Sequence, residues 1–432
     1  MNIITTINRT SAAHIGLSKK LEQFFDNNIK QVGLSFGDWS VLVPIVFKEE
    51  LREDIIELPQ VWNEKCTIPE LKYELKIKEN NIKLGPVIGF IPVRIRRELL
   101  NNLKGYEPYY ENCKHLNGLI LLCAANDIDI KNEHIQGFYF DSIKKTWEKG
   151  IFPIPDVLFR RTPIPQNTYR YLMGKLGKRL FNTPILNKWR VWRQLAISEQ
   201  LKDHLPPTNL LTIGYLDEML KQHGEVHIKP VEGYAALGIY KIRKQFSKYE
   251  LISLNGKKRL LSDRKMLLFL KSKRRYIVQK SIKTNRSENR NIVIRAILQK
   301  DKLKQWQCSG SYVRIGKKES IATNRHLTDT FSTIKDLFKD HYQLSEDQSA
   351  QKEQELYDLC IKACQVFERI GNYADVAIDV MMDEYHKFWI LEINHRHHNH
   401  SGPLQTINDR EMYNRVLISP FEYAKSLAGF PD

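Results

Sequence analysis

The chain of 432 residues carries 67 Lys and Arg against 50 Asp and Glu, and 42% of its residues are hydrophobic. This length predicts two or three domains, each large enough to bury a core of its own. No apolar run reaches the ~18 residues of a membrane helix, and residues 1–20 lack a signal core with a cleavage site. We therefore expect a cytoplasmic protein with no membrane partner.

The six cysteines include no CxxC pair, which argues against a disulfide framework and against a zinc ribbon. Two of them, four residues apart, fit one face of a helix. The sequence predicts buried thiols at these positions: Cys66, Cys113, Cys123, Cys308, Cys360 and Cys364.

In chain order, the first predicted unit is a small β-rich module at residues 1–77. Its runs "VGLSFGDW" and "SVLVPIVF" lie between Gly and charged turns, and "ELKYELKIKENNIKLG" alternates as strands do. Residues 78–175 follow as an open α/β unit, because "LNGLILLCAAND" is the continuous apolar run typical of a central parallel strand. The fold class expected for the whole chain is α/β.

The remainder of the chain alternates helices and strands without a repeat or a low-complexity linker. Residues 186–205 predict one amphipathic helix closed by "PPT", and residues 351–371 predict a longer helix that ends at Gly371. The runs "ADVAIDVMMD" and "KFWILEIN" around the polar turn "DEYHK" predict a hairpin.

The positive charge is concentrated in one block. Residues 241–304 contain 21 Lys and Arg against four Asp and Glu, a surplus equal to the +17 of the whole chain. Such a block suits an anionic partner, such as a nucleotide triphosphate, an acidic peptide, a polyanionic wall polymer or nucleic acid, or it is a solvated basic face. Nucleic acid is not expected, because the block lacks a known binding motif and has few aromatic residues for stacking: Phe246, Tyr249, Phe269 and Tyr276.

Oxygen ligands for a metal ion gather at the predicted hairpin. Glu392 and Asn394 share one face of their strand, and the neighbouring strand brings Asp379 beside them. Two carboxylates and an amide oxygen suit Mg²⁺ or Mn²⁺ bound to substrate phosphates. The hairpin therefore indicates nucleotide chemistry.

A phosphate-binding loop is predicted between two further strands. In "EVHIKPVEGYAALGIYKI", Lys229 ends an apolar strand, and a loop with Gly233 and Gly238 follows. A lysine binds phosphate oxygens, and glycine lets backbone amides approach an anion. A third strand, "RRYIVQKSI", would present Gln279 to an adenine edge.

Four histidines crowd the segment after the hairpin: His395, His397, His398 and His400. Three interpretations stay open for them. They form a polar loop without a chemical role, they contact the substrate as a general base or phosphate ligand, or they bind a transition metal.

The order of these pieces resembles that of ATP-grasp enzymes. "LGPVIGF", "FPIPDVLFRR", "RLFNTPILNKWRVWRQL", "KPVEGYAALGIYKI", "YIVQKSI" and "WILEIN" are similar to the YheC/YheD group, which is associated with endospore coats. The resemblance implies an ATP-grasp fold with an open pre-ATP-grasp domain at residues 78–175, a first lobe at 176–285 and a second lobe at 286–432. It covers residues 80–420.

The resemblance also implies roles for individual residues. Lys188 and Lys229 would reach the ATP phosphates, and residues 232–238, with Glu232, Gly233 and Gly238, would form a flap. Residues 279–282, with Gln279, Lys280 and Ile282, would be the hinge at the adenine. Arg295 and Arg314 would face the transferred phosphate or a substrate carboxylate. Asp379, Glu392 and Asn394 would hold the Mg²⁺ or Mn²⁺ ions.

The activity implied by the resemblance is ligation of a carboxylate to an amine through an acyl phosphate, with ATP and a carboxylate-bearing small molecule or peptide as partners. The setting implied is sporulation, in the mother cell or the spore coat, with coat proteins as further partners. The alternative is a structural coat protein without turnover. Three departures from the family pattern favour that alternative: Val293 replaces an Asp, Gly402 and Pro403 are displaced after the ExN strand, and no Gly-Gly follows Asn324.

Overall fold

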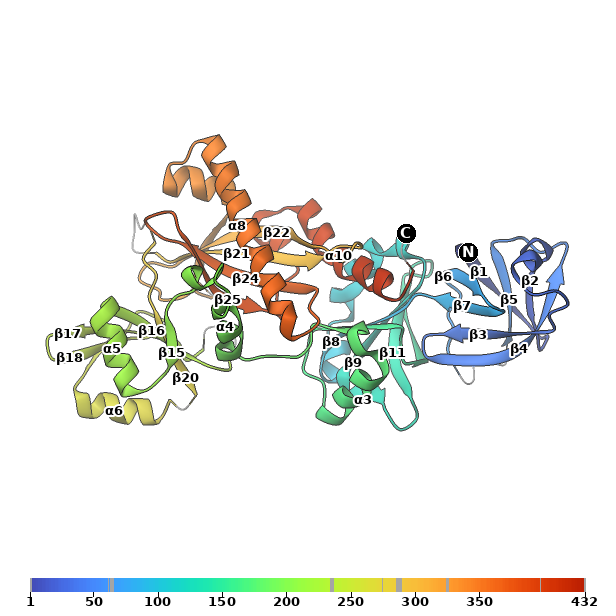
Figure 1. The fold of residues 1–432 in the computed structure, drawn as a ribbon, viewed down its shortest axis with the longest axis horizontal. Coiled ribbons are helices and arrows are strands. Elements are labelled where there is room, and N and C mark those ends of the chain that lie inside the picture. Colours follow the sequence, from blue (N-terminus) through green and yellow to red (C-terminus); the bar gives the residue numbers. More distant parts are fainter. Residues whose placement is uncertain are drawn as a thin grey trace.

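The computed structural model describes residues 2–60, 62, 66–233, 237–273, 275–284, 290–323, 326–396 and 398–430. Four sheets follow one another along an elongated molecule (Figure 1), in which a barrel lies at one end and two lobes lie at the other. A central sheet stands between them.

The first sheet is a closed barrel with the strand order β1-β5-β2-β4-β3-β7-β6. Strand β3 alternates buried and more exposed residues, and its Val32, Leu34 and Phe36 point inward. The strands are β1 (Asn2–Thr10), β2 (Ile15–Ser18), β3 (Gln31–Phe36), β4 (Trp39–Lys48), β5 (Ile55–Pro59), β6 (Lys72–Lys78) and β7 (Asn81–Gly85).

The central sheet is mostly parallel in its middle, where β8 pairs in parallel with both β9 and β13. Every residue of β9 is buried, as the apolar run predicted. The strands are β8 (Val87–Val93), β9 (Leu119–Ala124), β10 (Ile128–Asp129), β11 (His134–Asp141), β12 (Thr146–Pro153), β13 (Val157–Arg160) and β14 (Leu180–Phe181). Three helices accompany them: α1 (Arg96–Leu100), α2 (Glu107–Asn112) and α3 (Gln166–Leu176).

The small lobe is a six-stranded sheet with the order β15-β20-β16-β17-β18-β19. Helices α5 (Ile213–His223) and α6 (Asp263–Lys271) belong to it. Its strands are β15 (Thr208–Leu210), β16 (Glu225–Pro230), β17 (Tyr240–Gln245), β18 (Lys248–Ile252), β19 (Lys258–Leu261) and β20 (Tyr276–Lys280).

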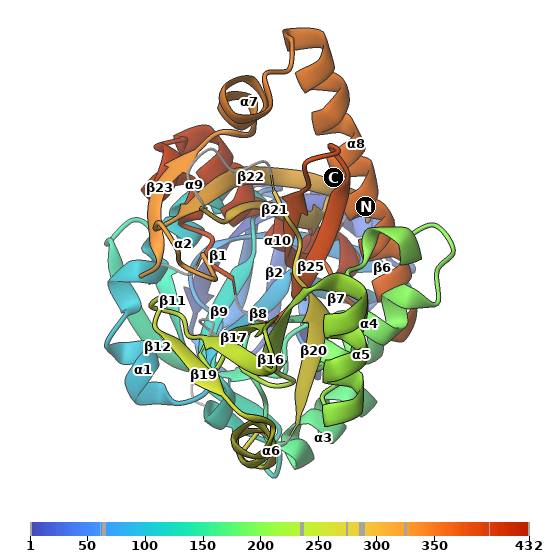
Figure 2. The same cartoon turned by 90° about the vertical axis from the view of Figure 1, so that its left-hand side faces the viewer.

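The large lobe is a five-stranded antiparallel sheet with the order β23-β22-β21-β24-β25. Figure 2 shows it above the small-lobe sheet. Its strands are β21 (Ile292–Lys300), β22 (Trp306–Gly316), β23 (Thr328–Ser332), β24 (Asp375–Met382) and β25 (Phe388–Asn394), and its helices are α7 (Ile334–Asp336), α8 (Glu346–Phe367), α9 (Gly402–Ile407) and α10 (Arg410–Leu427).

The C-terminal helix α10 packs the large lobe against the central sheet. Phe421 lies edge-on to Phe90 and to Phe159, with ring centroids 5.5 and 5.8 Å apart. Near its end, Lys425 pairs with Glu74 of the barrel at 2.6 Å, and both residues are buried. The end of the chain therefore fixes three of the four sheets relative to one another.

The prediction of a single helix over residues 186–205 was wrong beyond its first half. Helix α4 (Lys188–Ala196) ends early, and a 3-10 turn at Lys202–His204 follows. After Leu195 the backbone forms three-residue turns, with bonds from Ser198 N to the Leu195 carbonyl and from Leu201 N to the Ser198 carbonyl, each at 3.0 Å. These turns end the α-helical ladder.

The predictions for the thiols and for membrane spans can be compared with the structure. Five cysteines are buried, whereas Cys308 is partly exposed, and none of the six forms a disulfide. Within the described residues, no helix combines the length and the apolar composition that crossing a membrane requires.

Candidate functional site

The predicted metal ligands lie together on one face of the large-lobe sheet. Asp379 of β24 is directly opposite Glu392 of β25, and Asn394 is opposite Ala377. Residues paired across two strands share a face, so both carboxylates and the amide point the same way. The sequence prediction for the arrangement of these three side chains therefore agrees with the structure, and this donor set fits a hard divalent cation.

A β-bulge gives this face two different halves. The pairing of β24 with β25 shifts between Asp379 and Val380, which leaves Leu391 as the extra residue. Without the bulge, strand alternation would place Trp389 and Leu391 on the face opposite to Glu392. With the bulge, apolar residues and metal ligands line the same face in succession.

The apolar half was missed by the sequence analysis. It is a cluster of five side chains, four from the large lobe and one from the segment that joins the lobes: Val293, Met381, Trp389, Leu391 and Ile282. Lys280 lies over the Trp389 ring, 5.2 Å from its centroid, so the predicted hinge contacts the large lobe. The cluster is apolar and lies on the same sheet face as the carboxylates, next to Asp379 along β24. Val293, which departs from the family pattern, belongs to it.

Asp379 is neutralised by the two arginines that were predicted to face substrate. Arg295 donates two hydrogen bonds to its carboxylate, from Nε and Nη2, at 2.8 Å each, and Arg314 Nη2 lies 2.8 Å from Oδ1. Burial alone would raise the pKa of Asp379, but the two guanidinium groups outweigh it and lower the pKa below its usual range. In this state both arginines are therefore engaged with the protein's own carboxylate.

Glu392 contacts the first predicted lysine. Lys188 Nζ forms a close ion pair with Oε2 of Glu392, and Asn394 Nδ2 is 3.4 Å from Oε1. Burial would raise the pKa of Glu392, but Lys188 prevails and lowers it. Lys188 begins α4, whose preceding Asn187 caps the helix through a bond from Arg190 N at 2.9 Å. The helix start thus sets the position of the ammonium group.

Lys229 is in the small lobe, at the end of β16 as predicted. Its ammonium group donates to Gln279 Oε1 at 2.6 Å, and Gln279 Nε2 donates to Thr208 Oγ1 at 3.0 Å. Burial lowers the pKa of Lys229 to about 8, and it has no ion pair among the described residues. Gln279 therefore positions the lysine with its side chain, a role that the sequence analysis did not assign to it.

The residues that flank the predicted flap are described, whereas its centre, residues 234–236, lies outside the described residues, as does Asn324. Glu232 is exposed and lies 3.9 Å from Arg275. Gly238 has φ +79°, and a Cβ there would lie 2.7 Å from the Tyr276 hydroxyl. The loop therefore requires glycine at position 238 for both conformation and space.

The histidine segment forms a buried hydrogen-bond network. His398 Nε2 and His400 Nε2 each lie 3.0 Å from Asp375 Oδ1. His400 Nδ1 is 2.9 Å from the Tyr109 hydroxyl, which accepts a bond from Arg161 at 3.1 Å. Burial lowers the pKa of His400 to about 3 and also lowers that of His398. Both neutral imidazoles therefore donate to a carboxylate that joins the large lobe to the central sheet.

This network answers part of the question that the sequence left open. His395 Nε2 accepts from Leu186 N at 3.0 Å, and its ring packs against the stacked rings of Phe367 and Tyr373. Asp375, His398 and His400 have metal-ligand atoms within 4.8 Å of one another, but each of these atoms is already hydrogen-bonded within the network. The three described histidines are thus packed side chains rather than a polar surface loop. His397 lies outside the described residues.

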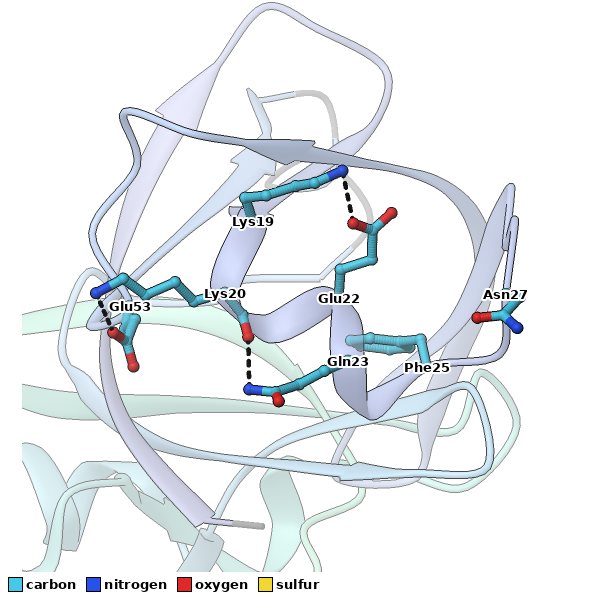
Figure 3. A pocket seen from close by; sticks show the side chains of 7 residues that line it. All are labelled: Lys19, Lys20, Glu22, Gln23, Phe25, Asn27 and Glu53. Carbon is cyan, nitrogen blue, oxygen red and sulfur yellow. Dashed lines mark hydrogen bonds and ion pairs between the residues drawn. The ribbon is translucent and has the colours of Figure 1, made fainter.

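A hollow on the barrel is separate from this face and lies at the other end of the molecule (Figures 1 and 3). It is lined by Lys19, Lys20, Glu22, Gln23, Phe25, Asn27 and Glu53. Its cations are already paired, since Lys19 lies 2.6 Å from Glu22 and Lys20 lies 3.0 Å from Glu53. The hollow therefore offers no excess charge to a ligand.

Known proteins resemble this chain in sequence and in structure. The chain is 22% identical over 413 residues to the endospore coat-associated protein YheD of Bacillus subtilis (strain 168), covering 88% of this chain and 89% of that protein. Among solved structures, the VanG D-Ala:D-Ser ligase from Enterococcus faecalis has a TM-score of 0.45 at 9% identity, covering 79% of this chain and 99% of that one. The D-alanine-D-alanine ligase from Coxiella burnetii has a TM-score of 0.43 at 12% identity, covering 80% and 94%.

The family model described as YheC/D like ATP-grasp matches residues 177–427, which include all the candidate site residues of the two lobes. This match confirms the ATP-grasp fold that the sequence predicted. The chain belongs to the YheC/D-like ATP-grasp family.

Proposed function

We propose that the protein is an ATP- and Mg²⁺-dependent ligase that joins a carboxylate to an amine. The observation that carries this proposal is the divided face between the lobes, where an apolar cluster adjoins two lysines and three oxygen ligands. Trp389 and Met381 offer a surface for the adenine, and Lys188, beside Glu392, and Lys229, beside Gln279, would approach the phosphate end. Asp379, Glu392 and Asn394 would hold Mg²⁺ or Mn²⁺, whose charge would neutralise phosphate oxygens.

The ion pairs of the free protein explain why nucleotide and metal would bind together. Glu392 is paired with Lys188, and Asp379 is paired with two arginines. A metal ion alone would compete with these internal cations, whereas a triphosphate gives Lys188 a new partner and frees Glu392 for the metal. Mg²⁺ without nucleotide is therefore expected to bind weakly.

In the proposed reaction, a substrate carboxylate oxygen attacks the γ-phosphorus of ATP, and the bond to the β-phosphate oxygen breaks to release ADP. An amine then attacks the acyl carbon, and inorganic phosphate leaves. The residues of this chain would contribute positioning and charge. Lys188 and Lys229 would hold phosphate oxygens, and Arg295 and Arg314, which now pair with Asp379, would stabilise the transferred phosphoryl group if a bound cation took their place at Asp379.

Trapping of the activated acid tests the ligase directly. The protein would be incubated with ATP, Mg²⁺, hydroxylamine and pools of carboxylic acids, because hydroxylamine converts an acyl phosphate into a stable hydroxamate. We expect hydroxamate and ADP in equal amounts for one class of acid, and neither product with Lys229→Gln. Nucleotide binding without ADP release for any pool would instead favour a coat protein that binds ATP without turnover, the alternative that the name of the Bacillus relative supports.

The pKa of Lys229 predicts how nucleotide affinity depends on pH. The free lysine has a pKa of about 8, and a bound triphosphate requires its ammonium form. Affinity should therefore hold up to pH 7 and fall about tenfold between pH 7 and pH 9, because binding must then take up a proton. Calorimetric titrations at both pH values with a non-hydrolysable ATP analogue measure this, and Lys229→Gln should remove the dependence. A flat profile in the parent protein would contradict the role of Lys229.

The setting that we propose is sporulation, in the mother-cell cytoplasm or the spore coat, and it rests on the name of the Bacillus relative alone. Coat proteins would be its partners there, and its substrate would be a carboxylate-bearing small molecule or peptide.

A further inference from the structure

One buried arginine of the central sheet has no acidic partner. Arg160, the last residue of β13, is only 5% exposed. Its Nε donates to the Thr162 carbonyl at 3.0 Å and its Nη1 to Thr183 Oγ1 at 3.2 Å, and it lies over the Tyr169 ring at 5.2 Å. Among the described residues, its Nη2 has no hydrogen-bond partner and no carboxylate pairs with it.

This situation is costly for the protein and differs from that of three other cations of the site. Arg295, Arg314 and Lys188 are each paired with a carboxylate. Burial, with a smaller contribution from Arg396, lowers the pKa of Arg160 to about 10. A buried charge without a counterion destabilises the fold, which an anionic ligand would relieve.

The position of Arg160 is that of a ligand site. It stands at the carboxyl end of a strand that is parallel to β8, and open α/β sheets bind ligands at these ends. The segment from Thr183, which bonds Arg160, continues to Leu186, which bonds His395. His395 directly follows Asn394, so Arg160 lies near the end of the strand that carries the metal ligands.

A second guanidinium group comes from that same strand end. Arg396 is exposed and has no hydrogen bond or ion pair within the described part of the chain. It directly follows His395, whose Nε2 accepts a bond from the segment that also bonds Arg160, and its charge lowers the pKa of both Arg160 and His395. Two arginines from distant parts of the chain, neither paired with an acid among the described residues, therefore lie near this segment.

We propose that Arg160 and Arg396 form an anion subsite that holds a carboxylate of the substrate beside the phosphate end of the nucleotide cleft. The planar edge of a guanidinium matches a carboxylate, and Arg160 offers the free Nη2 on that edge. The inference deepens the proposed function and rests on it for the identity of the ligand as substrate. Arg295 and Arg314, which were predicted for this role, are occupied by Asp379.

Malonate, a small dicarboxylate, is the probe for this subsite. The thermal midpoint of the full chain would be measured at increasing malonate, with sodium chloride at matched ionic strength as the reference. We expect a saturable rise of the midpoint in the parent protein, since a ligand that binds only the folded state stabilises it. Arg160→Gln and Arg396→Gln should both lose this rise.

Matched variants separate binding from folding. Arg179→Gln is the control, because Arg179 is a partly buried arginine of the same region that donates only to the carbonyls of Asp156 and Lys175, and it should keep the full malonate response. Arg396 is exposed, so its variant should fold normally. Without malonate, Arg160→Gln should have a midpoint at least as high as that of the parent protein, because it removes an unpaired buried charge.

The outcomes for this subsite and for the nucleotide site are distinguishable. A malonate response that is absent, or equal in the parent protein and both variants, would overturn the subsite. Loss of ATP-analogue binding in Arg160→Gln would also overturn it, because the residue would then belong to the nucleotide site. A response that depends on Arg160 in a protein that binds no nucleotide would support the subsite while contradicting the proposed ligase.

Discussion

Glu392→Gln is expected to weaken binding of an ATP analogue by about 10- to 100-fold in the presence of Mg²⁺, and to strengthen it a few-fold when Mg²⁺ is chelated. The first effect follows because the variant loses the charge of a metal ligand, and interactions with charged groups contribute about 1.5–3 kcal/mol. The second follows because Lys188 loses its internal partner and becomes free to bind phosphate. The volume of the side chain barely changes, so the fold should be preserved.

Calorimetric titrations of both proteins with and without Mg²⁺ measure these opposite shifts. Glu368→Gln is the matched control, because Glu368 is also partly buried and paired with a lysine, Lys300, at 2.6 Å, but lies at the end of α8. It should leave both affinities unchanged. An equal loss of affinity for Glu392→Gln in both conditions would mean that Glu392 supports the fold of the cleft and does not bind the metal.

Asp375→Ala should lower the free energy of unfolding by about 3–5 kcal/mol, the usual cost of leaving a buried charge without its partner. Asp375 is 1% exposed and lies 3.8 Å from Arg161 Nε, and it accepts bonds from two histidines and from Gln299 at 2.8 Å. Its removal leaves Arg161 unpaired and several buried donors without an acceptor. Because the network joins the large lobe to the central sheet, the variant should also loosen the segment after β25.

Urea unfolding followed by tryptophan fluorescence measures this loss. Asp54→Ala, which removes an exposed ion pair with Arg52, should unfold like the parent protein. A metal chelator should leave the unfolding of the parent protein unchanged if the network is held by hydrogen bonds alone. Destabilisation by the chelator, with little effect of Asp375→Ala in its presence, would show that a bound metal ion holds Asp375, His398 and His400 together.

The side chains that follow simple strand alternation could be predicted from the sequence. The hairpin, the shared face of Glu392 and Asn394, and the place of Lys229 at a strand end all depend on local pattern. The domain limits at residues 77, 175 and 285 and the functional roles of the site residues stay predictions. The roles and the limit at residue 285 depend on the family resemblance rather than on any local pattern.

Other features depend on contacts that no local pattern encodes. The bulge at Leu391 moves Trp389 to the face of Glu392, and a bulge has no sequence signature in this strand. The pairing of Arg295 with Asp379 joins residues 84 positions apart. The sequence alone therefore gave no sign of this ion pair, and Arg295 was predicted to face the substrate. The histidine segment seemed polar because its partners, Asp375 and Tyr109, come from distant strands and helices.

The central claim is that the face between the lobes binds a nucleotide together with a metal ion, and one calorimetric titration tests it most directly. The full chain would be titrated with a non-hydrolysable ATP analogue, once with Mg²⁺ and once with a chelator. We predict saturable binding that is much tighter with Mg²⁺. Absence of binding in both titrations, or equal affinity in both, would contradict the account.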